Sequence, residues 1–251
     1  MDRQLYLSMT GAKHAELQQA TTANNLSNAN TTGYKADRVA FRALPVIGPG
    51  APTRTYVVDN TIGHDLRMGA LQQTGNERDF ALVTPGFLAV QMPDGKEAYT
   101  RDGGFVLDAT GTLRTRSGLL ILNTQGGPIT VPLDQGIQLG SDGTVYSVPL
   151  SGDNITLDTV AQIKLVRPDP KQVYKGPDGL FHLNPDVPTP TLPPDPTVMI
   201  DTEKLEASNV NIVSSMIEMI THGRLFDLNY RMMQTVDQNE QRATQVLALN
   251  G

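Results

Sequence analysis

The N-terminal helical pattern of this chain stops at Ala23-Asn24-Asn25-Leu26-Ser27-Asn28-Ala29-Asn30-Thr31-Thr32-Gly33-Tyr34-Lys35. Asn and Gly tolerate the left-handed backbone conformation in which helices end, and Asn, Ser and Thr side chains bond to nearby backbone groups. We therefore expect a helix-exit motif, with Gly33 as the left-handed residue and Tyr34 as an anchor. The residues expected to shape this exit are Asn24, Asn25, Asn28, Thr31 and Gly33.

Residues 3–29 have the pattern of an amphipathic helix. The apolar positions recur every three to five residues and are Leu5, Met9, Ala12, Leu17, Ala20, Ala23 and Leu26. Because this stripe is thin and rich in alanine, it favours close approach to a second helix over burial in a bulky core. An isolated helix of this kind is marginal in water, so it needs a partner.

The C-terminal segment, residues 205–251, predicts a second and longer helix. Its apolar residues start at near-heptad spacing with Val213, Ile217 and Ile220 and continue with shifts to Leu247. A helix of some forty residues would be roughly 60 Å long, and patterns of that length are typical of coiled coils. Four methionines in this segment, among them Met216 and Met232, are interpreted as packing residues.

The two terminal helices have no other apolar partner in the sequence, so we expect them to pair as an antiparallel coiled coil. The longer C-terminal helix must then overhang its partner, and overhanging apolar surface is a candidate assembly interface. The expected helix and subunit interface residues are Leu5, Met9, Ala12, Leu26, Tyr34, Val213, Met216, Ile217, Ile220, Leu228, Met232, Val236 and Leu247.

The middle of the chain, residues 76–204, predicts a β domain. Short apolar runs of strand length occur at 80–83, 87–91, 105–107 and 119–122. Turn signals such as Asp94-Gly95, Asp102-Gly103 and Asp142-Gly143 separate strand-like runs, and Asp-Gly between such runs predicts antiparallel hairpins. Six prolines make residues 185–196 a stiff, extended linker.

The expected fold class is α+β, with terminal helices around a mainly antiparallel β domain. Residues 1–35 form the N-terminal helix and its exit, residues 36–75 an extended irregular connector without clear period, and residues 205–251 the C-terminal helix. Because residues 76–204 hold the apolar strands, we expect them to survive as a protease-resistant fragment.

The sequence contains no motif for catalysis, a metal or a cofactor. The four histidines are isolated, there is no cysteine, and no phosphate-binding loop, nucleophile elbow or calcium loop is present. The net charge of −6 argues against nucleic acid as a partner, and no apolar run has the length of a membrane span. We therefore expect a protein that is not an enzyme and has no cofactor.

Three motifs, in the same order, resemble the bacterial flagellar rod and hook protein family. They are Met1-Asp2-Arg3-Gln4-Leu5-Tyr6 with the helix-exit stretch, Asp79-Phe80-Ala81-Leu82 with Tyr99-Thr100-Arg101-Asp102-Gly103-Gly104-Phe105, and Leu205-Glu206-Ala207-Ser208-Asn209-Val210-Asn211. The opening and the length of 251 residues are most similar to proximal rod members. The resemblance covers nearly the whole chain.

The resemblance implies a structural subunit of the rod, the shaft that transmits motor torque to the hook. Its helices would form an inner tube with the β domain outside, in a rod that crosses the periplasm. Its partners would be further copies, other proximal rod proteins and the distal rod protein. Export would proceed through the flagellar type III apparatus, which agrees with the lack of a Sec signal pattern at Met1-Asp2-Arg3-Gln4. A distal rod protein and a non-flagellar coiled-coil adaptor are the alternatives.

Overall fold

In the computed structural model the chain passes four times between two units, after residues 28, 36, 65 and 209. The structure describes residues 3–45, 55–149 and 157–249. The helical unit comprises residues 1–28, 37–65 and 210–251, and the β-rich unit comprises residues 29–36 and 66–209. The combination of two helices with mainly antiparallel sheets confirms the α+β class.

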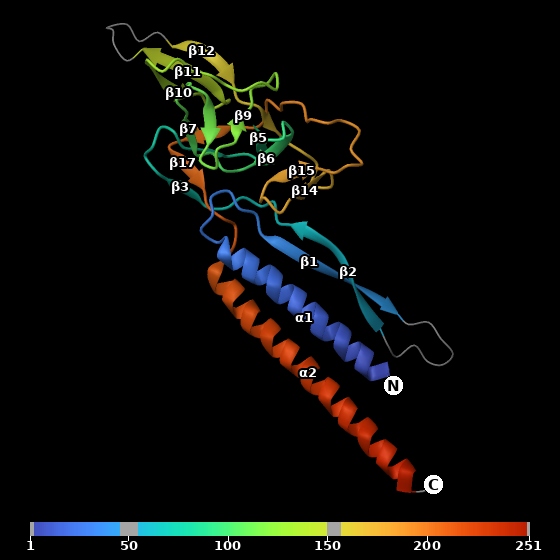
Figure 1. Cartoon of the computed structure of the whole chain (residues 1–251). Helices are drawn as coiled ribbons and strands as arrows, with labels where there is room; N and C mark the ends of the chain where they lie inside the picture. The colour runs from blue at the N-terminus through green and yellow to red at the C-terminus, as the bar shows by residue number, and fades with distance from the viewer. Residues whose placement is uncertain (1–2, 46–54, 150–156, 250–251) are drawn as a thin grey trace. The chain divides into compact units, whose positions relative to one another are not determined.

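The helical unit contains α1 (Arg3–Ser27), α2 (Ile212–Leu249) and a β-hairpin of β1 (Asp37–Pro45) and β2 (Thr55–His64). The two helices lie side by side and antiparallel, and α2 extends past the start of α1 (Figure 1). The hairpin corrects the expected irregular connector, because β1 and β2 pair along their whole length. The sequence of this segment has no clear hydrophobic period, so it did not predict the pairing. At one end of the hairpin Asp37 pairs with His64, and Asp37 Oδ1 lies 2.9 Å from His64 Nδ1.

The face of α2 that packs against α1 mixes polar residues with large apolar ones. Its buried or half-buried positions alternate at spacings of four and three residues: Ser215, Met219, His222, Phe226, Asn229, Met233 and Val236; Gly223, next to His222, is half-buried as well. The buried positions of α1 are Ser8, Ala12, His14, Ala15 and Thr22. Ala12 comes from the alanine-rich stripe, and at the neighbouring Gly11 the helices approach so closely that a Cβ would lie 2.5 Å from Asn229 Oδ1.

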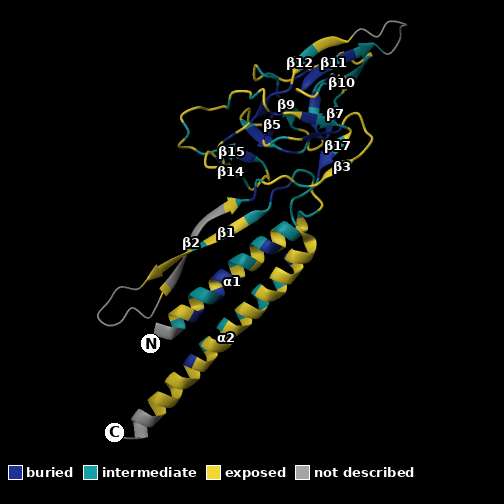
Figure 2. Ribbon diagram, turned by 180° about the vertical axis from the view of Figure 1, so that it is seen from behind, coloured by how far each residue is buried: buried dark blue, intermediate teal, exposed yellow. Residues whose placement is uncertain are grey.

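The described side chains of α2 beyond Val236 are mostly polar. Residues 237–245 are all exposed, and Ala243 is the only apolar residue among them. Figure 2 shows α2 exposed along most of its length. The expected overhang therefore exists, and among the described side chains of α2 the large exposed apolar ones lie at residues 212–232, alongside α1.

The β-rich unit is built from short strands. They are β3 (Leu71–Gln73), β4 (Phe80–Leu82), β5 (Phe87–Gln91), β6 (Glu97–Thr100), β7 (Phe105–Leu107), β8 (Leu113–Thr115), β9 (Leu120–Ile121), β10 (Gln135–Leu139), β11 (Thr144–Pro149), β12 (Asp158–Gln162), β13 (Leu165–Val166), β14 (Val173–Lys175), β15 (Phe181–Leu183), β16 (Ile200–Thr202) and β17 (Lys204–Glu206). The largest sheet has the order β14-β15-β6-β5-β9-β8-β7, and β13 pairs with β5. A second sheet has the order β10-β11-β12.

Strand β5 lies in the middle of the core. Because side chains alternate across a strand, Leu88 and Val90 enter one apolar cluster with Phe80 and Phe105. Phe87 and Ala89 enter a second cluster on the other face. All four residues from 87 to 90 are buried, which explains why this strand reads as a continuous apolar run.

The Asp-Gly signals predicted most hairpins correctly. Asp94-Gly95 joins β5 to β6 and Asp142-Gly143 joins β10 to β11, and both pairs are antiparallel neighbours. Asp102-Gly103 does not form a hairpin, because β6 and β7 are not neighbours in the sheet. Glycine is needed here because the backbone passes close to Phe80: a Cβ on Gly103 would lie 1.8 Å from the carbonyl oxygen of Phe80.

Two further segments differ from the expected boundaries. The proline-rich residues 185–196 pack along the β-rich unit, where Leu192 N donates to Tyr99 Oη over 3.2 Å and Asp195 N donates to Leu165 O over 2.9 Å. Residues 205–206, expected to open the C-terminal helix, instead belong to β17 (Lys204–Glu206), which pairs with β3. The preceding strand β16 pairs with β4, so the C-terminal side of the sequence completes the β-rich unit.

Candidate functional site

The residues expected at the interface occupy three kinds of position. Ala12 and Val236 are buried within the helical unit, and Leu5 and Leu26 are half-buried. Tyr34 is buried in the β-rich unit. The remaining expected residues with described side chains are exposed: Met9, Val213, Met216, Ile217, Ile220, Leu228 and Met232. Leu247 belongs to α2, but its side chain lies outside the described part of the chain.

The exposed members form what we call the outer apolar face of α2: Val213, Met216, Ile217, Ile220, Leu228 and Met232. Val213 is 68% exposed, Leu228 61% and Ile217 60%. Large apolar side chains at this exposure leave their favourable burial energy unused within the chain. Because they gather on one helix, they are a candidate surface for assembly.

The helix exit is capped by side chains of the predicted motif. The carbonyl oxygen of Asn24 accepts hydrogen bonds from Ser27 Oγ at 2.8 Å and from Asn28 Nδ2 at 3.0 Å. Asn25 makes a double bridge to the first residue of β1: its Nδ2 donates to Asp37 O and its Oδ1 accepts from Asp37 N, both at 2.8 Å. The asparagines thus satisfy the carbonyl groups at the end of α1 and fix the start of the hairpin.

In the β-rich unit, residues 31–34 form a tight turn. Tyr34 N donates to Thr31 O over 3.3 Å, and Gly33 has a φ of 69°, the left-handed conformation expected for it. A Cβ on Gly33 would lie 2.5 Å from the backbone carbon of Arg101, so glycine is needed for space as well as conformation. Lys175 Nζ lies 3.6 Å from the centre of the Tyr34 ring and covers it.

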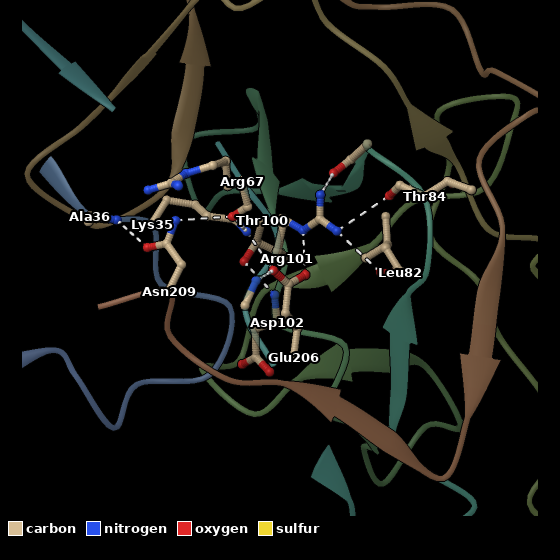
Figure 3. Close-up of polar contacts among 12 residues, drawn as sticks. Lys35, Ala36, Arg67, Leu82, Thr84, Thr100, Arg101, Asp102, Glu206 and Asn209 are labelled. Carbon is tan, nitrogen blue, oxygen red and sulfur yellow. Dashed lines mark hydrogen bonds and ion pairs between the residues drawn. The ribbon is translucent and has the colours of Figure 1, made fainter. Parts of the chain in front are cut away.

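Next to this turn lies what we call the buried charge cluster, formed by Lys35, Arg101 and Glu206 (Figure 3). Glu206 Oε1 lies 2.5 Å from Lys35 Nζ, and Glu206 Oε2 lies 2.6 Å from Arg101 Nε. All three side chains are at most 2% exposed. Charges so far from water are tolerated only when they are paired and hydrogen-bonded.

The three side chains of the cluster also form hydrogen bonds with backbone groups. Lys35 Nζ donates to Arg67 O over 2.7 Å, and Glu206 Oε1 accepts from Gly69 N over 2.8 Å. Arg101 donates to the carbonyl oxygens of Gly86 and Leu82 at 3.0 and 3.2 Å. The cluster therefore joins residues 35, 67–69, 82–101 and 206, which are far apart in the sequence.

Asn209 adds a bridge at the edge of this cluster. Its Oδ1 accepts from Ala36 N at 2.8 Å, and its Nδ2 donates to Arg67 O at 3.0 Å (Figure 3). Each of these partners lies within two residues of a point where the chain enters or leaves the β-rich unit, after residues 36, 65 and 209. The asparagine thus ties these segments together within the unit.

The sequence reasoning missed the buried charge cluster, although each member lies within one of the three recognised motifs. A lone charged residue is normally interpreted as solvated surface, and no local spacing shows that three of them meet. The available signal was indirect: each charge stands among residues that read as buried or as turns, as Arg101 does between Tyr99 and Gly103.

Within the described ranges, no group of three or more His, Asp or Glu side chains is placed to hold a metal ion. In the same part of the chain, no helix is long and apolar enough to cross a membrane.

Three family models match the chain at the positions of the three motifs. A model described as "Flagella basal body rod protein" matches residues 5–35, one described as "Flagellar hook protein FlgE/F/G D1 domain" matches residues 81–147, and one described as "Flagellar basal body rod FlgEFG protein C-terminal" matches residues 202–246. The flagellar basal-body rod protein FlgF of Escherichia coli (strain K12) is 38% identical over the whole of both chains. The chain belongs to the FlgF family of flagellar basal-body rod proteins.

Further relatives agree with this assignment. FlgF of Salmonella typhimurium is also 38% identical over the whole of both chains. The rod protein FlgG of Bacillus subtilis (strain 168) is 33% identical over 95% of this chain and 96% of its own. As a FlgF-family member, the protein is a structural subunit of the flagellar basal-body rod. Each of the three matched regions contributes one residue to the buried charge cluster: Lys35, Arg101 and Glu206.

Proposed function

We propose that the protein assembles axially into the proximal rod through the outer apolar face of α2. The observation that carries this proposal is the exposure of Val213, Ile217 and Ile220, each at least 58% exposed, on a helix whose opposite face packs against α1. A subunit that buries this face against a neighbour gains apolar contact that the single chain lacks. A head-to-tail contact that does not close on itself produces a helical stack.

The two helices pair, in this proposal, as an antiparallel coiled coil. The alternating spacing of four and three residues from Ser215 to Val236 supports it, because it is the spacing of a heptad seam. The residues of the outer apolar face lie outside this seam and therefore remain available to other subunits. The helices would line an inner tube, and the β-rich unit would lie outside it.

The partners in this arrangement are further copies, other proximal rod proteins and the distal rod protein. The assembled shaft would transmit motor torque to the hook across the periplasm. Export through the flagellar type III apparatus belongs to the same proposal and is supported by family membership. A distal rod role is less well supported, since the FlgF relatives named above match at the higher identity.

Replacing Ile217 by glutamate tests the assembly face. Ile217 is 60% exposed, so the I217E monomer should fold with an unchanged melting temperature. Each interface that buries Ile217 should weaken by about 1.5–3 kcal/mol or more, or roughly 10- to 100-fold in affinity. Basal bodies isolated from a strain with I217E in place of the wild-type gene should lack complete rods and hooks, and the cells should not swim.

The matched control is Q238E, which adds the same charge on the exposed polar overhang of α2. It should leave rods, hooks and swimming intact. Normal rods with I217E would contradict the proposed face, and a non-flagellar adaptor would be favoured if deletion of the whole gene also left the rods normal. Circular dichroism of both purified variants separates an assembly defect from a folding defect.

A further inference from the structure

The β-rich unit is closed by residues from both ends of the sequence. Residues 29–36 enter it from the N-terminal side, and residues 200–209 enter it from the C-terminal side. Strands β16 and β17 pair with β4 and β3, and Gly33 N donates to Glu206 O over 2.8 Å. The unit is therefore discontinuous in the sequence: it is built from residues 29–36 and 66–209.

Glu206 holds these parts together with one carboxylate. Oxygen Oε1 binds Lys35 Nζ and Gly69 N, and Oε2 binds Arg101 Nε, at distances from 2.5 to 2.8 Å. The side chain is fully buried, and so is that of Lys35. Within the cluster one carboxylate binds two cations, so its loss removes the ion-pair partner that both share.

A chain whose C-terminal segment has not yet docked lacks the carboxylate of Glu206 in this cluster. If residues 29–202 took their final positions alone, Lys35 and Arg101 would lack the carboxylate that both bind. The cost of an unpaired buried charge exceeds the net gain from most single contacts.

We propose that Glu206 is a folding latch: the β-rich unit, including its central strands β5 and β6, is stable only while the C-terminal segment 200–209 is docked. The unit then closes late, after nearly all of the chain is available. Export of the chain in an unfolded state rests on the proposed function. Under such export, late closure would keep the β-rich unit unfolded until its C-terminal side has left the export channel.

Hydrogen exchange of the full-length purified monomer tests the latch. In E206Q, the amides of β5 and β6 should lose protection together with residues 29–36 and 200–209, by about 100-fold or more, the size expected from breaking a buried ion pair. If only the terminal segments lose protection while β5 and β6 remain as protected as in the wild type, the latch is wrong and Glu206 is a local clasp.

Two further variants keep the test decisive. N184A removes the bond from Asn184 Nδ2 to Lys171 O, 2.6 Å long and remote from the cluster in sequence, and should raise exchange only near residues 171 and 184. It shows that local opening is detectable. Should E206Q fail to fold, E206D, which keeps the charge but shortens the reach, should show the same joint loss at smaller amplitude; a loss confined to the terminal segments would overturn the proposal. The exchange measurement needs no assembled rod, so its outcome is independent of the proposed function.

Discussion

Asp102 is a half-buried carboxylic acid next to the buried charge cluster. Burial raises its pKa above the ordinary value of 3.8, and this effect exceeds the lowering by the Gly104 N–H and by Arg116. A carboxyl whose pKa is higher in the folded state binds its proton more tightly there. Its ionisation therefore weakens the fold progressively as the pH rises through 3.8 toward the folded pKa.

Replacing Asp102 by asparagine removes that penalty, because the amide oxygen still accepts the bond from Gly104 N, 3.1 Å in the native protein. We expect D102N to be more stable than the wild type at pH 7 and equally stable near pH 3, measured as the free energy of unfolding in urea. The opposite control is D142N: the Thr144 backbone N–H and hydroxyl lower the pKa of Asp142, so this variant should be less stable at pH 7. A D102N protein that is destabilised at pH 7 would refute the argument.

At this scale the sequence allowed some residues to be assigned but not others. Gly33 was predictable because a left-handed helix exit depends on local conformation, and so was the capping role of Asn28, whose side chain donates to Asn24 O. Lys35 and Glu206 were not, since their pairing across 171 positions depends on the tertiary fold. Electrostatic partners that are distant in sequence leave no local period to detect.

The pairing of the two helices includes a close contact at Gly11. A Cβ on Gly11 would lie 2.5 Å from Asn229 Oδ1, and Asn229 Nδ2 is held by a 2.8 Å bond to Leu225 O. Alanine is normally favoured over glycine within a helix by about 1 kcal/mol. At Gly11 the extra methyl group should instead displace the amide, with an overpacking cost of about 1–3 kcal/mol.

We therefore expect G11A to destabilise the protein by about 1 kcal/mol in thermal or urea unfolding. The matched control is Gly223 in α2, where a Cβ would meet nothing within 4 Å; G223A should be stabilising by up to about 1 kcal/mol. In an N229A background, G11A should become stabilising as well. Equal stabilisation by G11A and G223A in the native background would show that the contact does not control the packing.

Among the elements, helices and hairpins with strong local signals were predicted well. The helix patterns anticipated α1 and α2, and Asp-Gly turns anticipated the β5–β6 and β10–β11 hairpins. The β1–β2 hairpin was missed because its residues lack a clear alternation. The face of α2 that meets α1 was predicted only at Val236, because Ser215, His222 and Asn229 interrupt its apolar residues Met219, Phe226 and Met233.

The division of the whole molecule was harder to predict than its elements. A sequence read in order suggests consecutive domains, so residues 76–204 looked complete. The structure instead adds residues 29–36, 66–75 and 205–209 to the β-rich unit and takes residues 37–65 into the helical unit. Such discontinuous units depend on long-range contacts, among them the pairing of β17 with β3 and the bonds of Glu206.

Limited proteolysis of the dilute monomer should reveal this division. The helical unit buries few residues of α2 and leaves its outer apolar face uncovered, so both ends of the chain should be trimmed first. The limiting product should begin near residue 29 and end at or just after residue 209, because cleavage at 204 would remove Glu206, the carboxylate that both Lys35 and Arg101 bind. Mass spectrometry of the product distinguishes the two boundaries. A stable fragment of residues 76–204 would contradict the structural division, and the same digestion of assembled rods should leave α2 intact if its outer face is buried between subunits.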